Sequence, residues 1–569
     1  MNGAELVIAF LQAKNVECGF GYPGGPVLVL YEAIYNAKFN HILTRHEQGA
    51  IHAAEGYAKV TGKPGVVFAT SGPGATNLAT GLADARLDSV PVLAITGAVA
   101  RCDTGSDAFQ EADITGVTEP ITKYNYLVMN EEDLLPSLEE AWQMTTSGRP
   151  GPVLVNIPKD ILALEIPNEL TVMRPTRRHR PMHKRAEDQV DKIVEALRAS
   201  QRPLLMAGGG CVISPSAPDE LERLSRAIQL PCVTTLMGKG ALRTDNPNYL
   251  GHVGMHGTVQ SNRALARCDL MLIVGSRLSD RVIANPSECN AKQRVVVHVD
   301  IDGSEIGKRL MPDIVVQDDA GRFLHHLSQA LEKTVEFDPD WSEWLSMLDE
   351  TTVKFNELIE KQVVYEQPLL TSYVIAHTSN RFKGLNPIVA TDVGQHQMFA
   401  AQYFDIESPR SFLTSGGLGT MGFGLPAALG ASYADPSRPT VAIVGDGGFQ
   451  MTIQELGLLR QEQLPVCVLI MDNSTLGMVR QWQELFFDEH YSQSMLTQNP
   501  DFVKIAEAYD IKARNIQTKE ELDDALTWFI ENRKPLVLRV RVKTMENVFP
   551  MIPAGKGPDD LIMPGFEGC

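Results

Sequence analysis

The sequence has few cysteines, no excess of basic residues and no sustained apolar run, and each deficit argues against a class of protein. No two of its eight cysteines stand in a CxxC spacing, so neither a zinc site nor a disulfide framework is indicated. Aspartate and glutamate outnumber lysine and arginine by 70 to 51, a formal charge of −19, which argues against binding to nucleic acid phosphates. An anionic substrate would therefore need locally placed cations.

Membrane and export signals are also lacking. The uncharged stretch 64–82 is crowded with glycine, proline and threonine and makes a poor membrane span. The first residues, MNGAELVIAFLQAKNVE, lack the basic segment and cleavage site of a signal peptide and instead predict an amphipathic helix. We therefore expect a soluble, cytoplasmic protein.

The length of 569 residues predicts three domains of ordinary size. Short apolar runs such as 66–69 and 153–157 alternate with helical patterns, which is typical of α/β domains with doubly wound parallel sheets. The expected boundaries are a first domain at 1–165, a linker rich in proline and arginine at 166–187, a central domain at 188–335, a helical connector at 336–367, a third domain at 368–545 and a tail over the active site at 546–569.

The most informative stretch is 439–475, PTVAIVGDGGFQMTIQELGLLRQEQLPVCVLIMDNST. An apolar run breaks at a GDGG turn, a helical pattern follows at 452–460, and a second apolar run ends at Asp472 and Asn473. This order predicts a βαβ unit with parallel strands. Because ligands bind where such strands end, Asp446 and Asn473 should be neighbours in space.

One carboxylate and one amide oxygen at a glycine-lined strand edge suit Mg²⁺ bound to a phosphorylated ligand. Two other interpretations remain open. The asparagine could be unrelated to the glycine turn. Alternatively, GLGTMG at 417–422 matches GxGxxG and has Asp446 24 residues after its last glycine, which resembles a dinucleotide fingerprint.

A faint internal repeat links the two ends of the chain. SGPGATN at 71–77 and SGGLGTM at 415–421 each follow a predicted strand and lead into a helix of small residues. One old duplication is the economical explanation, although convergent glycine loops would look the same.

Glu47, in RHEQGA, would ordinarily be a glutamate on a helix surface. Here it begins a helix after an apolar strand and precedes the SGPGATN loop. The GDG turn with its asparagine, RHEQGA and SGPGATN together resemble the thiamine diphosphate enzymes. In that family the glutamate bonds the aminopyrimidine ring and shuttles a proton there.

Further segments narrow the resemblance to the acetohydroxyacid synthase (acetolactate synthase) large subunit, over nearly the whole chain. They are GYPGGPV at 21–27, DAFQE at 107–111, SGRPGPV at 147–153, GMHGT at 254–258, VGQHQM at 393–398, GGLGTMGFGLPAALGA at 416–431, LGMVRQWQ at 476–483 and NVFPMIPAGK at 547–556.

The resemblance implies three domains in the order pyrimidine, FAD and diphosphate, with each active site between two subunits of a homodimer or homotetramer. It implies a transferase that decarboxylates pyruvate and joins the two-carbon unit to pyruvate or 2-oxobutyrate, giving 2-acetolactate or 2-aceto-2-hydroxybutyrate, in branched-chain amino acid biosynthesis. A small regulatory subunit is a possible partner, and FAD would be bound without redox turnover.

The resemblance also implies roles for individual residues. Glu47 would act on the pyrimidine, Arg277 would meet the second substrate's carboxylate, and Trp482 would shape the acceptor pocket. Gln110 and Lys159, with Phe109, would line the access channel. The metal ligands would be Asp446, Asn473 and the main-chain carbonyl of Thr475.

The remaining implied positions bind cofactors. For thiamine diphosphate they are Pro23, Gly24, Glu47, Pro73, Asn77, Val393, Gly394, Gln395, His396, Gly419, Met421, Gly445, Asp446, Gly447, Gly448, Asn473, Gly477 and Met478. For FAD they are Arg149, Gly208, Gly209, Thr235, Leu236, Met255, His256, Gly257, Gly275, Arg277, Asp300, Ile301, Asp318 and Asp319.

Two departures from the family pattern concern FAD. Residues 277–281 are Arg-Leu-Ser-Asp-Arg where the family usually has Arg-Phe-Asp-Asp-Arg, and Phe399 replaces a common tryptophan. The alternatives are an acetolactate synthase of the catabolic kind that lacks FAD, another thiamine diphosphate-dependent 2-oxoacid decarboxylase or oxidase, and a catalytically dead paralogue. The last would lack Glu47, Asp446 or Asn473, and all three are present.

Overall fold

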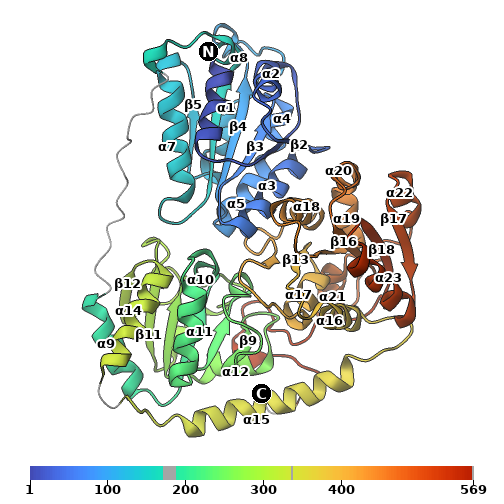
Figure 1. The fold of residues 1–569 in the computed structure, drawn as a ribbon. Helices are drawn as coiled ribbons and strands as arrows, with labels where there is room; N and C mark the ends of the chain where they lie inside the picture. Colours follow the sequence, from blue (N-terminus) through green and yellow to red (C-terminus); the bar gives the residue numbers. More distant parts are fainter. Residues whose placement is uncertain (171–186, 335–336, 567–569) are drawn as a thin grey trace.

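The computed structural model describes residues 1–170, 187–334 and 337–566 (Figure 1). Most of the predicted linker and the last three residues of the predicted tail lie outside this part of the chain. Three parallel six-stranded sheets follow one another along the sequence, which confirms the predicted α/β fold class.

The first sheet has the strand order β2-β1-β3-β4-β6-β5. Its helix α1 (Gly3–Ala13) confirms the helix predicted at the N-terminus, and Asn2 and Glu5 form a capping box there. The strands are β1 (Gly19–Gly21), β2 (His41–Leu43), β3 (Gly65–Ala69), β4 (Val92–Ala98), β5 (Tyr124–Leu127) and β6 (Pro152–Pro158), and the other helices are α2 (Leu28–Asn36), α3 (Glu47–Thr61), α4 (Pro73–Thr76), α5 (Ala79–Asp88), α6 (Ile114–Thr118), α7 (Leu134–Thr146) and α8 (Lys159–Ala163).

The middle sheet has the order β12-β11-β10-β7-β8-β9. Read from its other edge, this is the order 3-2-1-4-5-6 of dinucleotide-binding folds. Its strands are β7 (Pro203–Ala207), β8 (Cys232–Thr234), β9 (Tyr249–His252), β10 (Leu270–Val274), β11 (Val295–Asp300) and β12 (Ile314–Gln317), and its helices are α9 (Glu187–Ala199), α10 (Gly209–Ile213), α11 (Ala217–Ile228), α12 (Val259–Arg267), α13 (Pro286–Ala291) and α14 (Ala320–Lys333).

The third sheet has the order β14-β13-β15-β16-β18-β17, and α15 (Ser342–Gln362), which precedes it in the chain, runs beneath the middle and third domains in the view of Figure 1. The strands are β13 (Ile388–Thr391), β14 (Phe412–Leu413), β15 (Thr440–Gly445), β16 (Val466–Asp472), β17 (Lys512–Ile516) and β18 (Leu536–Arg541), and the helices are α16 (Thr371–Phe382), α17 (Gln395–Tyr403), α18 (Gly424–Ala434), α19 (Asp446–Met451), α20 (Leu456–Glu462), α21 (Gly477–Phe486), α22 (Phe502–Ala508) and α23 (Lys519–Asn532).

The first and third sheets share one topology, which supports the predicted duplication, but the two loops that suggested it are not equivalent. SGPGATN follows β3, the third strand of its sheet, whereas SGGLGTM follows β14, the second strand of its own. The position equivalent to SGPGATN is therefore the GDGG turn after β15, and SGGLGTM corresponds to the turn before Glu47. The two similar glycine loops therefore do not occupy equivalent positions in the two sheets.

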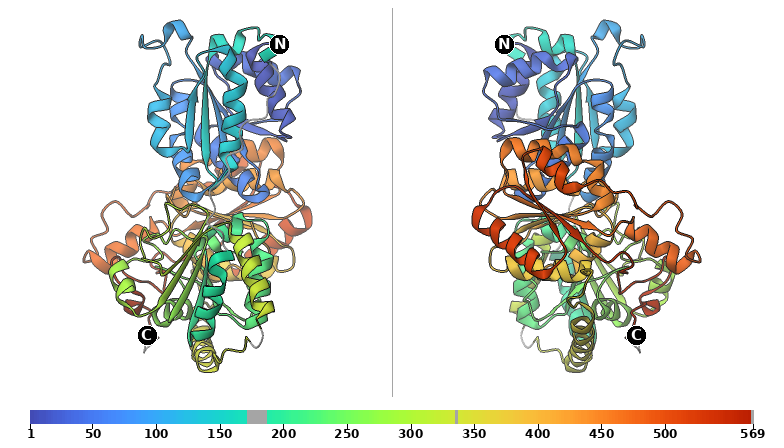
Figure 2. Two further views of the ribbon diagram at one scale, coloured as in Figure 1. Left: turned by 90° about the vertical axis from the view of Figure 1, so that its left-hand side faces the viewer. Right: turned by 90° about the vertical axis from the view of Figure 1, so that its right-hand side faces the viewer.

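Helices α3 and α18 hold the first domain against the third. Positions with little or no side chain let the two main chains approach closely: a Cβ on Gly56 would stand 2.0 Å from the Ala427 carbonyl oxygen. One continuous apolar core contains residues from both domains, among them Ile51 of α3 and Leu429 of α18. Figure 2 shows the first domain above the other two, in contact with the third.

The helix predicted at 452–460 begins earlier and is interrupted. Helix α19 starts at Asp446 itself, α20 ends at Glu462, and a 3₁₀ turn (Ile453–Glu455) separates them. The interruption has a local cause, because the Thr452 hydroxyl donates a 2.9 Å hydrogen bond to the Gly422 carbonyl. Asp446 thus lies in the first turn of a helix, where its negative charge is favoured.

Within the described residues, none of the helices combines the length and the apolar character that crossing a bilayer requires.

Candidate active site

Asp446 and Asn473 follow two neighbouring strands of the third sheet. Strands β15 and β16 are parallel, and Gly445 pairs with Met471 in register. This confirms the predicted βαβ unit. Both residues line the same cavity, which places a carboxylate and an amide oxygen at one sheet edge.

The Asp446 carboxylate is buried and held in place. One oxygen accepts a 3.0 Å hydrogen bond from the Gly447 amide, and the other accepts one of 2.7 Å from Asn499 Nδ2. Burial raises the pKa of Asp446 to about 7, and the nearby Asp472 contributes. A divalent cation at this carboxylate would offset that cost of charge.

Asp472 is the counterpart of Asp446 in this arrangement. It is fully buried and accepts hydrogen bonds from Arg539 (2.7 Å) and Arg541 (2.9 Å). Burial opposes ionisation, but the two arginines lower the pKa of Asp472. Asn499 Nδ2 also lies 3.2 Å from Asp472. The Asn499 amide therefore links the carboxylate of Asp472, which pairs with the two arginines, to the carboxylate of Asp446. Asn499 has no motif in the sequence that could have identified it.

The surroundings of Asp446 fit a metal-bound diphosphate. His396 Nε2 and Thr475 Oγ1 are buried polar atoms without a hydrogen-bond partner, and burial lowers the pKa of His396 to about 4, so its neutral ring can donate. A Cβ on Gly445 would stand 2.9 Å from the His396 ring, so a larger residue would crowd that ring. The side-chain oxygens of Asp446 and Asn473 are of the kind that Mg²⁺ prefers as ligands.

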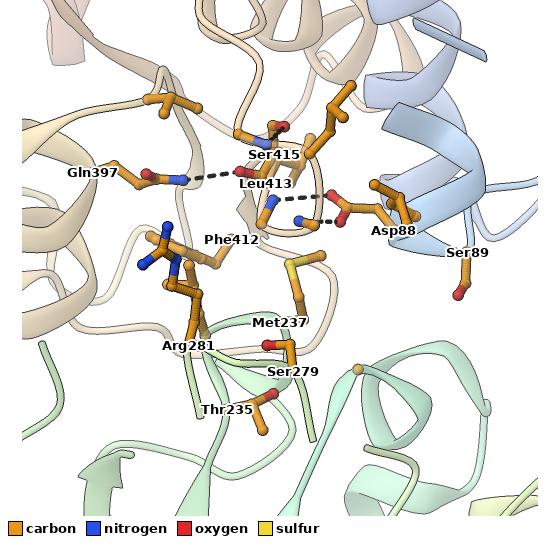
Figure 3. Close-up of a pocket in the computed structure, with 18 of the residues that line it drawn as sticks. Asp88, Ser89, Thr235, Met237, Ser279, Arg281, Gln397, Phe412, Leu413 and Ser415 are labelled. Carbon is orange, nitrogen blue, oxygen red and sulfur yellow. Dashed lines mark hydrogen bonds between the residues drawn. The ribbon is translucent and has the colours of Figure 1, made fainter. Parts of the chain in front are cut away.

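A cavity of about 1530 Å³ extends from this edge into the middle domain. It exceeds the usual volume of a site for one small molecule, so it has room for more than one ligand. Figure 3 shows part of its wall, where the first, middle and third domains meet around Asp88, Met237 and Ser415. The predicted positions that line it are Arg149, Gly209, Thr235, Leu236, Met255, His256, Gly275, Arg277, Asp300, Ile301, Asp318, Asp319, Val393, Gly394, Gln395, His396, Gly419, Met421, Gly445, Asp446, Gly447, Gly448, Asn473, Thr475, Gly477, Met478 and Trp482.

In the middle domain the cavity reaches the point where the strand order reverses, between β7 and β10. The chain turns tightly here, since a Cβ on Gly208 would stand 2.2 Å from the Gly275 carbonyl oxygen. His256 Nε2 is buried without a partner, and burial raises the pKa of Asp300 to about 6. A topological switch point with unpartnered polar atoms fits a dinucleotide such as FAD.

Gly208 and Gly257 are two predicted FAD positions that do not line the cavity. The structure gives both a packing reason for being glycine, because a Cβ on Gly257 would stand 2.5 Å from the His252 carbonyl oxygen. The GLGTMG segment follows β14, an edge strand, whereas a dinucleotide fingerprint follows a central strand. The dinucleotide interpretation of the third domain is therefore not supported.

Glu47 lies at a second sheet edge, in the first domain. It is the first residue of α3, 8% exposed, and accepts a 2.9 Å hydrogen bond from Asn77 Nδ2. The nearby Thr70 and Ser71 hydroxyls are buried without partners. These residues lie with Pro23, Gly24 and Pro73 at the ends of β1, β2 and β3, and none of them lines the cavity.

The predicted channel residues also lie on the first domain. Phe109 is 88% exposed, and Gln110 adopts a left-handed conformation with φ of 62°. Lys159 extends to within 3.9 Å of Asp103. Within the described single chain none of the three lines the cavity. Phe109 and Lys159 are exposed and Gln110 is partly exposed, which leaves them available to a second subunit.

Glu455 connects the two sheet edges. It follows α19 in the third domain, is fully buried, and accepts hydrogen bonds of 3.0 and 3.2 Å from the Arg45 amide, just before Glu47. Burial raises the pKa of Glu455 to about 7. No local sequence pattern predicts this contact, because it joins residues 410 positions apart.

The C-terminal segment packs beside the cavity. The Ile552 amide donates a 2.8 Å hydrogen bond to the Met255 carbonyl, and Gln481 Nε2 donates one of 3.0 Å to the Val548 carbonyl. The segment thereby joins α21, which carries Met478 and Trp482, to the middle domain.

Comparison with known proteins agrees with this geometry. Three family models match the three domains: the N-terminal TPP binding domain of thiamine pyrophosphate enzymes over residues 1–117, their central domain over 190–327, and their C-terminal TPP binding domain over 392–540. The chain belongs to the thiamine pyrophosphate enzyme family.

Curated relatives in this family match along nearly the whole chain. The acetolactate synthase isozyme 2 large subunit of Escherichia coli is 43% identical, covering 99% of both chains. The acetolactate synthase large subunit of Lactococcus lactis is also 43% identical, over 99% of this chain and 96% of its own. The chloroplastic acetolactate synthase of Arabidopsis thaliana is 42% identical, over 99% of this chain and 84% of its own. The predicted family resemblance is thus confirmed.

Proposed function

We propose that this chain is a thiamine diphosphate-dependent acetolactate synthase that decarboxylates pyruvate and joins the two-carbon unit to pyruvate or 2-oxobutyrate. The observation that carries the proposal is the presence of two sheet edges in one chain: one that carries Glu47 and a second that carries Asp446 and Asn473. The relatives named acetolactate synthase support the same reaction.

Asp446, Asn473 and the Thr475 carbonyl would hold Mg²⁺ against the diphosphate. When bound, thiamine diphosphate would supply a carbon nucleophile and an electron sink for the electrons released with CO₂. His396 and the glycines of 445–448 would contact the phosphate oxygens. Met421 and Met478 line the cavity beyond this point and would support the apolar part of the cofactor.

Glu47 would bond the pyrimidine and move a proton at its ring nitrogen. The Asn77 amide orients the carboxylate, and Glu455 fixes the start of the helix that carries it. Glu47 lies outside the cavity of its own chain, which supports an active site formed by two subunits, with Glu47 from one and Asp446 from the other. The protein would therefore be at least a homodimer.

Arg277 and Trp482 both line the cavity. The Arg277 guanidinium lies close to Gly417 of the third domain, where it could meet the carboxylate of the second 2-oxoacid. Burial lowers the pKa of Arg277, but an arginine stays charged in proteins. It supplies the local cation that an anionic substrate needs in an acidic protein.

FAD would occupy the middle-domain end of the cavity. The 3-2-1-4-5-6 strand order and the unpartnered His256 favour this over the alternative that lacks FAD. We also propose a cytoplasmic location and a small regulatory subunit as partner, the latter because the bacterial relatives are named large subunits.

The test is an assay of the purified protein with pyruvate, Mg²⁺ and thiamine diphosphate, with and without FAD. We expect acetolactate, and loss of the product when thiamine diphosphate is omitted. Glu47→Gln should slow exchange of the cofactor C2 proton, followed by NMR, by about 10²- to 10⁴-fold, whereas Glu17→Gln, at an exposed glutamate, should not. Carbon dioxide and acetaldehyde without acetolactate would identify a decarboxylase instead.

A further inference from the structure

The loop of residues 414–421 in the third domain is held by helix α5 of the first domain. Asp88, the last residue of α5, accepts hydrogen bonds from two successive loop amides, 3.2 Å from Gly416 and 2.7 Å from Gly417. Figure 3 shows both contacts. Neither domain could fix this loop in that way without the other.

A second aspartate of α5 holds the same loop one turn earlier. The Ser415 hydroxyl donates a 2.5 Å hydrogen bond to Asp84. The same hydroxyl accepts hydrogen bonds from the amides of Gly419 (3.1 Å) and Thr420 (2.8 Å). Ser415 therefore links Asp84 to the amides at the far end of the loop.

Lys59 completes the arrangement. Its ammonium group donates to Asp88 at 2.8 Å and to the Thr414 carbonyl at 2.7 Å. Because the Asp88 side chain is fully buried and that of Lys59 largely so, their ion pair is a charge-assisted contact sheltered from water, which is stronger than an exposed one. The Thr420 hydroxyl also donates to Asp84 at 3.3 Å, so five of the eight residues of the loop are tied directly to the first domain by side chains of α3 and α5.

The loop forms part of the cavity wall, to which it contributes Leu418, Gly419 and Met421. A Cβ on Gly447, the residue after Asp446, would stand 3.7 Å from Met421 Cε. Gly419 has φ of 76° and Gly422 has φ of 93°, so the shape of the loop depends on left-handed turns that contacts must hold in place. A Cβ on Gly417 would stand 3.2 Å from the Arg277 guanidinium. A shift of the loop would therefore move the cavity wall both in the third domain and beside Arg277.

We infer that Asp84 and Asp88 are positioning residues that fix the 414–421 loop across the domain boundary and thereby preorganise the thiamine diphosphate site. This inference rests on the proposed function, because it assigns the loop to the cofactor. Asp84 acts through the Ser415 and Thr420 hydroxyls, and Asp88 acts through the amides of Gly416 and Gly417. The expected cost of removing either aspartate is a looser cofactor site rather than altered chemistry.

The test uses Asp88→Asn in the full-length protein. In this variant an NH₂ group, which donates, replaces one carboxylate oxygen, which accepts. It would face Lys59 or a loop amide, both of which are also donors, so that hydrogen bond is lost. Ser415→Ala, which breaks the tie to Asp84, is the second variant and remains informative if Asp88→Asn does not fold. Asp510→Asn, at an aspartate that is 82% exposed, is the matched control.

Two readouts are needed. Hydrogen–deuterium exchange of the peptide spanning the loop should become faster in Asp88→Asn and Ser415→Ala but not in Asp510→Asn. Thiamine diphosphate should bind roughly tenfold more weakly, the size of one lost hydrogen bond to a charged group, while kcat at saturating cofactor stays within about twofold of the wild type.

Unchanged exchange in both variants would overturn the inference, and so would faster exchange with unchanged cofactor affinity or a large loss of kcat at saturation. Failure of the wild type to bind thiamine diphosphate would overturn the proposed function instead. In that event the exchange data would still report whether the two aspartates hold the loop.

Discussion

Gly430 of α18 lies directly against Ala53 of α3: a Cβ at position 430 would stand 1.8 Å from the Ala53 carbonyl oxygen. Any side chain here must push the first and third domains apart. Gly430→Ala should therefore lower the thermal unfolding midpoint, with an overpacking cost of about 1–3 kcal/mol. Gly25→Ala is the control, since no atom lies within 4 Å of a Cβ at that position. Equal midpoints for the two variants would show that the helices are not in this contact.

The amide of Asn499 holds Asp446 in place, and its loss should weaken metal binding without abolishing it. Asp446→Ala removes the carboxylate that would bind Mg²⁺, so isothermal titration should detect no thiamine diphosphate binding at ordinary Mg²⁺. Asn499→Ala should raise the Mg²⁺ requirement roughly tenfold, as expected of an outer partner of a metal ligand. Wild-type cofactor affinity in Asp446→Ala would contradict the metal assignment.

Trp482 should set the choice of acceptor. It lines the cavity on α21, with its ring centroid 5.7 Å from that of Phe486. The extra methylene of 2-oxobutyrate against an indole should favour that acceptor over pyruvate by about 1–3 kcal/mol, or 10- to 200-fold.

Trp482→Leu should abolish the preference and keep carboligation onto pyruvate. Competition between the two acceptors in one tube, with both products quantified, measures this. A wild type without preference, or a variant that retains it, would assign Trp482 to packing.

Glu455 should make stability depend on pH. Burial raises its pKa from 4.5 to about 7 in the folded protein, so the folded state binds the proton more tightly than the unfolded state. The stabilisation from that proton is fully present below the unfolded pKa and is lost as the pH rises through about 7.

Glu455→Gln removes the ionisable group. Between about pH 6 and about pH 8.5 the wild type should lose about 1 kcal/mol of stability relative to the variant. Denaturant unfolding of both proteins at several pH values measures the difference. A constant difference across the range would mean that Glu455 does not titrate there.

The site was predicted best where the functional residues directly follow a predicted strand. The apolar runs around the GDGG turn and Asn473 imply parallel neighbours, and the pairing of β15 with β16 follows from them. Local patterns could not reveal contacts between distant elements. Asn499, Glu455 and Asp88 act across loops or domains, and their immediate sequences resemble ordinary surface segments.

Two local interpretations failed for a similar reason. The helix at 452–460 is broken because Thr452 bonds a loop 30 residues earlier, which no periodicity records. The glycine loops at 71–77 and 415–421 are alike in composition, yet they follow different strands of the shared topology. Glycine content reports close approach of the backbone, not the position of a loop in a fold.

The central claim is that Glu47 of one subunit and Asp446 of another act in one active site, and mixing two inactive variants tests it most directly. Glu47→Gln and Asp446→Ala would be inactive alone. After mixing and subunit exchange, half of the dimers would be hybrids, and each hybrid would contain one site with both residues intact. The account predicts that acetolactate formation from pyruvate recovers to about a quarter of the wild-type rate. No recovery, with hybrid dimers demonstrated in the mixture, would contradict it.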